Sequence, residues 1–320
     1  MTSFASCGLV VGHATDVAGA TGCTVIRGDR GPFRCGVAVV GRATGTRELA
    51  LLEPSHLVDR VDAILLAGGS AYGLDAAAGV MRWMEERGRG FDVGAGVVPI
   101  VPAAVLFDLA PLGRFDARPT ADMAYEACER GTADVVEGAV GAGTGATVGK
   151  LAGAGSAMKG GIGCGAASAG AVEVRALAAV NALGDVRDAN GRIVAGARAA
   201  DGSWLDSSTV LARGGSGKGD GEDRFSELAG RSTTLCVVAT NAALDRAALG
   251  ALARSASAAL YRRITPVATQ FDGDVIFATA PMSGGVEANV AQVEALAVGA
   301  LETAIERSVH AASPGDILEP

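Results

Sequence analysis

Short apolar segments alternate with amphipathic segments along the chain. Residues 61–69 (VDAILLAGG) form an apolar run that stops at two glycines, and residues 74–87 (LDAAAGVMRWMEER) follow with apolar positions at helical spacing. This order predicts a strand, a glycine turn and a helix. Residues 95–105 are apolar but contain prolines, which predicts a strand with irregular ends. Thr120 is expected to cap a helix that extends to Arg130.

The second half of the chain repeats this alternation. Residues 213–231 (RGGSGKGDGEDRFSELAGR) are glycine-rich and charged, a composition typical of an exposed, mobile connector. Two sheets with helices outside them fit the number of strands better than a single parallel sheet does. The predicted elements are strands over 172–186 (with a turn at Gly184), 233–240 and 274–280, and helices over 243 to about 263 and from about Val286 to His310.

The composition limits the class of protein. Of the 320 residues 49% are hydrophobic, which suffices for a sizeable core, and the 47 glycines favour layers whose backbones approach one another closely. Acidic residues outnumber basic ones by 35 to 27, a net charge of −8, which argues against binding of nucleic acid or an anionic membrane. No apolar stretch reaches the roughly 20 residues that span a bilayer, and the N-terminus lacks the basic region of a signal peptide. We therefore expect a soluble, cytoplasmic protein.

Familiar catalytic and metal-binding motifs are missing from the sequence. The six cysteines contain no CxxC pair and only three histidines accompany them, so they are interpreted as buried, reduced side chains. There is no GxSxG motif for a serine hydrolase. The segment VGAGTGATVGK (140–150) resembles a phosphate-binding loop, but Leu151 follows Lys150 where that motif needs Ser or Thr. We expect no metal and no organic cofactor.

Three hydroxyl residues, Ser232, Thr233 and Thr234, lie where the connector meets a buried strand. A threonine at such a junction can attack the preceding carbonyl, form an ester by an N-to-O acyl shift, and be released by water as a new N-terminal residue. Its free amine then serves as the base for its own hydroxyl. The alternative is that β-branched threonine simply favours strands. The residues of this stretch alone leave both interpretations open.

Several sequence blocks resemble one family in order along nearly the whole chain. They are GGSAYGLDAAAGVMRWMEE (68–86), VPIVPAAVLFDL (98–109), VGAGTGATVGKLAG (140–153), AMKGGIG (157–163), VNALGDV (180–186), TTLCVVATNAAL (233–244) and FDGDVIFATA (271–280). The chain is similar to the DmpA-type aminopeptidases, or L-aminopeptidase/D-esterases, which belong to the N-terminal-nucleophile hydrolases. The resemblance implies an α/β fold, a four-layer αββα sandwich like that of the ornithine acetyltransferases, matured by autoproteolysis.

The resemblance also implies a nucleophile and a cut site. Thr233 matches the family nucleophile, so Ser232–Thr233 is the expected scissile bond of a single domain over 1–320. Cleavage would give an α chain of 1–232 and a β chain of 233–320. Relatives commonly carry Asn, Asp or Gly before the nucleophile, so Ser232 is a departure that can slow the cut. A shift of one residue would make Ser232 or Thr234 the nucleophile instead.

Four further residues are implied as site residues, with one alternative. Asn181 matches an asparagine whose side-chain amide helps to form the oxyanion hole. Asp272 and Asp274 match a pair of positions that carry Asp-Gly-Asp in the nylon-hydrolase branch, and we expect them to bind the liberated Thr233 ammonium; a DG turn that leads into a strand is the alternative. Lys150 matches a lysine of the same branch, and we expect it to lower the pKa of the threonine hydroxyl or to polarise the carbonyl; an exposed, salt-bridged lysine is the alternative. Lys159 is the competing lysine.

The expected activity is hydrolysis of small peptides or amide oligomers through an acyl-enzyme on Thr233. Hydrolysis of 6-aminohexanoate oligomers is the alternative that Lys150, Asp272 and Asp274 suggest. An uncleaved, non-catalytic homologue and a threonine-dependent acyltransferase are the other hypotheses. The family resemblance implies a homo-oligomer, a tetramer of αβ units.

Overall fold

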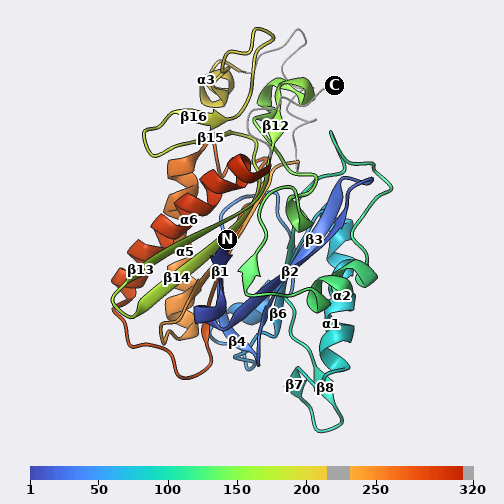
Figure 1. Ribbon diagram of the computed structural model, residues 1–320, viewed down its shortest axis with the longest axis vertical. Coiled ribbons are helices and arrows are strands. Elements are labelled where there is room, and N and C mark those ends of the chain that lie inside the picture. The colour runs from blue at the N-terminus through green and yellow to red at the C-terminus, as the bar shows by residue number, and fades with distance from the viewer. Residues whose placement is uncertain (215–230, 313–320) are drawn as a thin grey trace.

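The computed structural model describes residues 1–214 and 231–312. In this part of the chain two five-stranded sheets lie face to face between two pairs of helices (Figure 1). The first sheet has the order β13 (Gly161–Ala169), β14 (Val172–Asn181), β17 (Thr233–Thr240), β19 (Val275–Pro281) and β4 (Phe33–Val39). The second has the order β2 (Leu9–Asp16), β3 (Thr21–Gly28), β6 (Ala63–Ala67), β9 (Ala103–Val105) and β5 (Gly45–Arg47).

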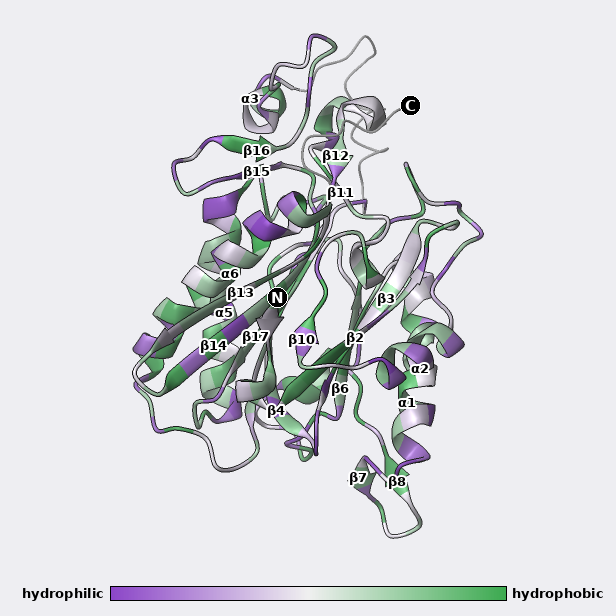
Figure 2. Ribbon diagram, viewed as in Figure 1, coloured by the Kyte–Doolittle hydropathy of each residue, from purple (hydrophilic) through white to green (hydrophobic). Residues whose placement is uncertain are grey.

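Helices cover the outer face of each sheet, which completes four layers. The first sheet packs against α5 (Arg246–Arg263) and α6 (Val290–Ala312), and the second against α1 (Ala77–Glu85) and α2 (Ala121–Glu129). Figure 2 shows hydrophobic residues along β2 and β6, whereas α1, α2 and α6 carry both hydrophobic and hydrophilic residues. The predicted αββα layering is therefore confirmed.

Strand β17 is buried on both faces, each of which packs against a different hydrophobic core. Leu235 and Val237 pack between the sheets, while Cys236 and Val238 pack toward the helices α5 and α6. Alternate side chains of a strand face opposite sides, so a strand buried on both faces is a continuous apolar run. All six cysteines are buried thiols, as expected from their apolar surroundings.

Glycines allow α6 to lie directly on the first sheet. A Cβ on Gly163 in β13 would stand 2.1 Å from the carbonyl oxygen of Ala304, and one on Gly165 would stand 2.0 Å from that of Ala300. No side chain fits in such a gap. The expectation that glycines mark close backbone approach is confirmed here.

The predicted elements are present with shifted ends. The helix expected from residue 74 starts as a 3-10 turn over Ser70–Ala76 before α1, and the Thr120 hydroxyl does cap α2 by accepting from Met123 N. Helix α5 begins at Arg246, later than predicted, because the Asp245 carboxylate caps it through Ala248 N. Residue 286 forms a bridge with Ala242, so α6 begins only at Val290.

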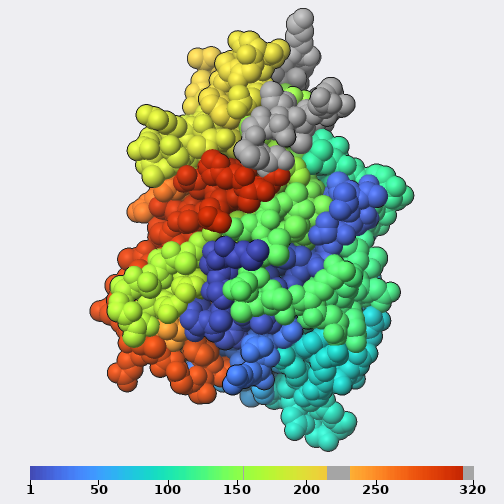
Figure 3. All heavy atoms as spheres, viewed as in Figure 1, coloured from blue at the N-terminus to red at the C-terminus, as the bar shows by residue number. Residues whose placement is uncertain are grey.

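The strand expected over 95–105 is divided by its prolines into β8 (Val97–Val98) and β9. Other strands were not predicted. In the two large sheets they are β2, β3, β4, β5 and β13. Outside them they are β7 (Phe91–Asp92), which pairs with β8; β11 (Thr147–Val148) with β12 (Met158–Lys159); β16 (Ile193–Ala195) and β18 (Ile264–Thr265); and β1 (Thr2–Ser3) with β10 (Asp134–Val135), at the centre of the face in Figure 3. Both β16 and β18 pair with β15 (Asp185–Arg187), which the turn at Gly184 separates from β14.

Two expectations concern regions beyond the sheets. The connector predicted over 213–231 lies outside the described residues except for positions 213, 214 and 231; it follows the short helix α3 (Ser207–Ala212). Within the described ranges, every helix is too short or too polar to cross a membrane.

Candidate active site

The topology of the first sheet brings three of the candidate segments together. Strand β14 ends at Asn181, which is paired with Thr233, the first residue of β17, in the antiparallel register. Strand β19 runs parallel to β17, and the turn before it carries Asp272 and Asp274. The starts of β17 and β19 and the end of β14 therefore lie at one edge of the sheet.

Thr233 lies against the peptide bond that it is predicted to cleave. Its Oγ1 donates to the carbonyl oxygen of Ser232 at 2.6 Å, and Gly273 N donates to the same oxygen at 2.8 Å. Thr233 is only 3% exposed and Ser232 1%. The hydroxyl and the Ser232 carbonyl are therefore held together, away from solvent, in the intact chain.

The side chain of Asn181 is fixed by four partners. Its Oδ1 accepts from Thr147 N at 3.0 Å and from the Lys150 ammonium at 2.8 Å. Its Nδ2 donates to the carbonyl oxygens of Phe107 at 2.8 Å and Arg231 at 3.3 Å. Since donors surround the oxygen and acceptors surround the nitrogen, only one orientation of the amide satisfies all four contacts.

Lys150 is a buried cation surrounded by oxygens. Its Nζ donates to the carbonyl oxygen and Oδ1 of Asn181, each at 2.8 Å, and to the carbonyl oxygen of Arg231 at 2.9 Å. These three acceptors match the three N–H groups of an ammonium. Burial lowers the pKa of Lys150 from 10.5 to about 7, although Asp272 and Asp274 act to raise it.

The two carboxylates hold the turn and the strand start rather than the nucleophile. Asp272 accepts from the backbone N and the hydroxyl of Thr269, at 2.9 and 2.7 Å. Asp274 accepts from Thr234 N at 2.6 Å and from Ala268 N at 3.3 Å. No hydrogen bond links either carboxylate to Thr233 in the described, intact chain. Their predicted contact with a liberated Thr233 ammonium applies to the cleaved form and stays a prediction.

Burial also shifts the titration of this acidic pair. Burial, and after it the neighbouring Asp272, raise the pKa of Asp274 to about 7. Burial likewise raises the pKa of Asp272, against the opposing effects of Thr269 and Lys150. Two carboxyls and one amine thus share a site in which the charged form of each is disfavoured, an arrangement common at functional sites.

Lys159, the competing lysine, has another environment. Its Nζ donates to the carbonyl oxygens of Gly143, Ala146 and Gly160 at 3.1, 3.0 and 3.2 Å. Burial lowers its pKa to about 8, and Asp108 acts to raise it. Lys150 therefore contacts Asn181 directly, while Lys159 binds the backbone of the glycine-rich segment.

Sequence reasoning missed the backbone groups of the site. They are Gly273 N, Thr147 N and the carbonyl oxygens of Phe107 and Arg231. Main-chain N–H and C=O groups occur at nearly every residue, so no residue type marks them. A glycine between two aspartates is the only local signal.

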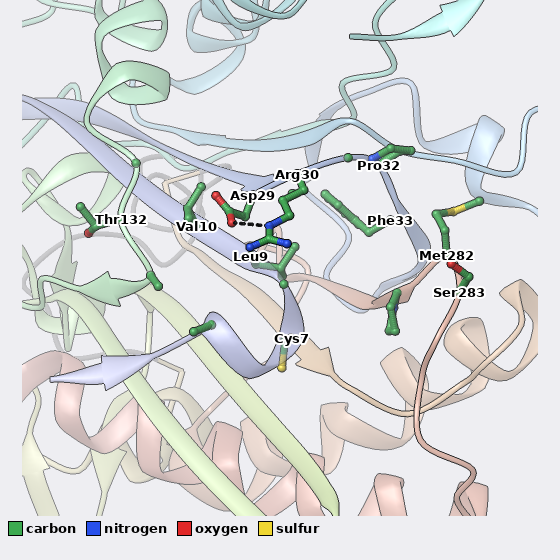
Figure 4. A pocket seen from close by; sticks show the side chains of 17 residues that line it. Cys7, Leu9, Val10, Asp29, Arg30, Pro32, Phe33, Thr132, Met282 and Ser283 are labelled. Atoms are coloured by element: carbon green, nitrogen blue, oxygen red, sulfur yellow. Dashed lines mark ion pairs between the residues drawn. The ribbon is translucent and has the colours of Figure 1, made fainter.

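The side chains of the candidate site are buried in the intact chain, and an open groove lies elsewhere. That groove, of about 770 Å³, is lined by residues 7–10, 28–33 and 281–283 among others, and none of the candidate site residues borders it (Figure 4). Its Asp29–Arg30 ion pair, at 3.8 Å, is exposed. Among residues 1–214 and 231–312 no group of three or more His, Cys, Asp or Glu is placed to hold a metal ion. The expected lack of a cofactor stays a prediction.

Known proteins resemble this chain in sequence and in fold. An uncharacterized aminopeptidase of Mycobacterium tuberculosis (strain ATCC 25618 / H37Rv) is 41% identical over 266 residues, which cover 78% of this chain and 74% of the relative. A 6-aminohexanoate-oligomer endohydrolase of Kocuria sp. (strain KY2) is 29% identical over 314 residues, 93% of this chain and 81% of the relative.

Among solved structures, the L-aminopeptidase D-Ala-esterase/amidase from Ochrobactrum anthropi, described as a variant of the Ntn hydrolase fold, superposes with a TM-score of 0.68 at 21% identity. The match covers 97% of this chain and 87% of that one. A Burkholderia sp. beta-aminopeptidase superposes with a TM-score of 0.66 at 20% identity, covering 94% and 84%. The fold is therefore that of these hydrolases.

The family model of peptidase family S58 matches residues 7–316, almost the whole chain. This match agrees with the aminopeptidase relatives and with the fold, and it confirms the resemblance inferred from the sequence blocks. The chain belongs to peptidase family S58 and is an aminopeptidase-like hydrolase.

Proposed function

We propose that the protein is a self-processing N-terminal-threonine amide hydrolase whose nucleophile is Thr233. The observation that carries the proposal is the 2.6 Å contact between Thr233 Oγ1 and the carbonyl oxygen of Ser232, at the start of a buried strand. This contact supports the proposal because it keeps the Thr233 hydroxyl beside the Ser232–Thr233 bond. Proximity of this kind contributes substantially to catalysis because no orientational entropy is lost at the moment of attack.

Self-cleavage would generate the catalyst. Attack of the Thr233 hydroxyl on the Ser232 carbonyl carbon gives an ester, and water releases an α chain of 1–232 and a β chain of 233–320. The new Thr233 amine then takes the proton of its own hydroxyl as a general base. Asp272 and Asp274, beside the start of β17, would bind the ammonium form of that amine and shift its pKa.

Substrate hydrolysis would follow through an acyl-enzyme on Thr233. Departure of the α-chain end would remove the Arg231 carbonyl from Lys150 and Asn181, which would leave one N–H group of each free to bind the oxyanion of a substrate carbonyl. Donors aimed at a developing oxyanion are often the largest single contribution to catalysis. The proposed substrates are small peptides or amide oligomers, and the proposed assembly is a homo-oligomer of αβ units in the cytoplasm.

Hydrolysis of 6-aminohexanoate oligomers is a second candidate activity. It is favoured by the buried Lys150 beside Asn181 and by the Asp-Gly-Asp turn, the residue types that the sequence resemblance associates with that branch. The relative named as a 6-aminohexanoate-oligomer endohydrolase is similar over 93% of this chain. Lys150 would act on either substrate as an oxyanion donor.

A substrate panel tests the proposed function. Protein that a denaturing gel shows to be cleaved is assayed on aminoacyl p-nitroanilides, β-peptides and 6-aminohexanoate oligomers. We expect hydrolysis of at least one class, with none by the Thr233→Ala variant prepared in parallel. Equal rates for wild type and Thr233→Ala would exclude Thr233 as the nucleophile, and an uncleaved wild-type chain with no activity would favour a non-catalytic homologue.

A further inference from the structure

Two consecutive carbonyls precede Thr233, and each is bound by a different set of donors. The Ser232 carbonyl oxygen accepts from Gly273 N at 2.8 Å and from Thr233 Oγ1 at 2.6 Å. The Arg231 carbonyl oxygen accepts from Lys150 Nζ at 2.9 Å and from Asn181 Nδ2 at 3.3 Å. The donors that resemble an oxyanion hole are thus occupied by the carbonyl that is not cut.

The backbone of Gly273 is held rigidly beside the scissile carbonyl. Ser232 and Asp272 form a parallel bridge, so this N–H is part of the ladder that extends β17 toward β19. A Cβ at Gly273 would stand 2.7 Å from Thr233 Oγ1 and 2.6 Å from the carbonyl oxygen of Ala43. Only glycine lets the backbone approach the nucleophile this closely.

The geometry points to separate oxyanion donors for the two reactions of this protein: Gly273 N–H for self-cleavage, and Lys150 with Asn181 for substrate hydrolysis. The inference rests on the proposed function and deepens it. In the intact chain the substrate donors are filled by the Arg231 carbonyl. They become free only when residues 231 and 232 leave with the α chain.

Self-cleavage consumes no reactant other than water. Thr233 Oγ1 forms a bond to the Ser232 carbonyl carbon, and the carbonyl oxygen takes the negative charge while it accepts the Gly273 N–H. The bond from that carbon to Thr233 N then breaks, and the proton lost by the hydroxyl ends on this nitrogen. Water hydrolyses the resulting ester to the Ser232 carboxylate and the Thr233 hydroxyl.

Replacing one backbone N–H by oxygen tests the first half of the inference. Glycolic acid is incorporated in place of Gly273 by cell-free translation of the full chain, so that an ester replaces the amide and the donor is lost without added bulk. The same replacement at the exposed Gly284 is the control. Self-cleavage, followed on denaturing gels, is expected to slow by about 10²- to 10³-fold at position 273, the loss typical of one oxyanion donor, and to be unchanged at 284.

The Asn181→Asp variant tests the second half. It keeps oxygens for Lys150 and Thr147 but removes the Nδ2 donor. We expect hydrolysis of a small amide to fall about 10²- to 10³-fold, whereas self-cleavage slows less than about tenfold. Self-cleavage at full rate in the position 273 ester, or a loss of cleavage in Asn181→Asp as large as its loss of hydrolysis, would overturn the inference. A wild-type chain that never cleaves would instead overturn the proposed function and this inference with it.

Discussion

Replacing Lys150 by methionine removes the only charged donor that contacts Asn181 in the described part of the chain. Three hydrogen bonds are lost, but two of the three acceptors keep another donor: Asn181 Oδ1 still accepts from Thr147 N, and the Arg231 carbonyl oxygen from Asn181 Nδ2. Loss of one transition-state donor predicts a fall in kcat of about 10²- to 10³-fold. The free energy of unfolding should fall by only about 1–3 kcal/mol.

Lys159→Met is the matched control. Lys159 also donates three hydrogen bonds to oxygens and also has a lowered pKa, but its partners are the carbonyls of the glycine-rich segment. The two variants should therefore lose similar stability in urea denaturation, while only Lys150→Met loses kcat by two orders of magnitude or more. Rates are measured on protein that a gel shows to be cleaved.

The pH dependence of kcat tests the predicted role of Lys150 independently. Because burial lowers the pKa of Lys150 to about 7, its ammonium form decreases from about nine-tenths to about one-tenth between pH 6 and pH 8. The ratio of wild-type kcat to Lys150→Met kcat should therefore shrink about tenfold over this range. A loss of kcat in Lys159→Met as large as in Lys150→Met would refute the assignment of Lys150 as the donor.

Two other predictions concern stability. The folded-state pKa of Asp274 is raised from 3.8 to about 7, so the folded chain keeps a proton that the unfolded chain releases between these values. The free energy of unfolding therefore decreases as pH rises from about 4 to about 7, and Asp274→Asn should reduce this slope in urea titrations. Gly163→Ala should destabilise the fold by about 1–3 kcal/mol, since its methyl would meet the carbonyl of Ala304. Gly299→Ala, in open space on α6, should be neutral or slightly stabilising in thermal melts, and a loss there equal to that of Gly163→Ala would contradict the packing argument.

The sequence predicts strongly patterned elements well and glycine-rich strands poorly. The strand over 233–240 is predicted with the bounds that the structure has, because a central strand buried on both faces is a continuous apolar run. Strand β13 (GIGCGAASA) has low intrinsic strand propensity and was not predicted. Its glycines are required by the contact with α6, which lies more than 120 residues away in the chain. Packing against α6 therefore determines that residues 161–169 form a strand.

The candidate site also has residues that the sequence predicts and groups that only the structure reveals. Thr233, Asn181 and Lys150 were inferred from the resemblance of their sequence blocks. The sheet register pairs Thr233 with Asn181, and Lys150, which lies outside the sheet, donates to the Asn181 side chain. The choice between Lys150 and Lys159 depends on which lysine reaches Asn181, and spacing in the sequence does not encode that distance. The donor at Gly273 is a backbone group, and it was found only from the geometry around the Ser232 carbonyl.

Intact-mass spectrometry tests most directly whether Thr233 cleaves the chain before it. Purified wild-type protein and Thr233→Ala are incubated under the same conditions and measured under denaturing conditions. We expect two species for the wild type, with masses of residues 1–232 and 233–320, and one uncut species for Thr233→Ala. A wild-type chain that stays whole after prolonged incubation, or a Thr233→Ala chain that is still cut at the same bond, would contradict self-cleavage by Thr233.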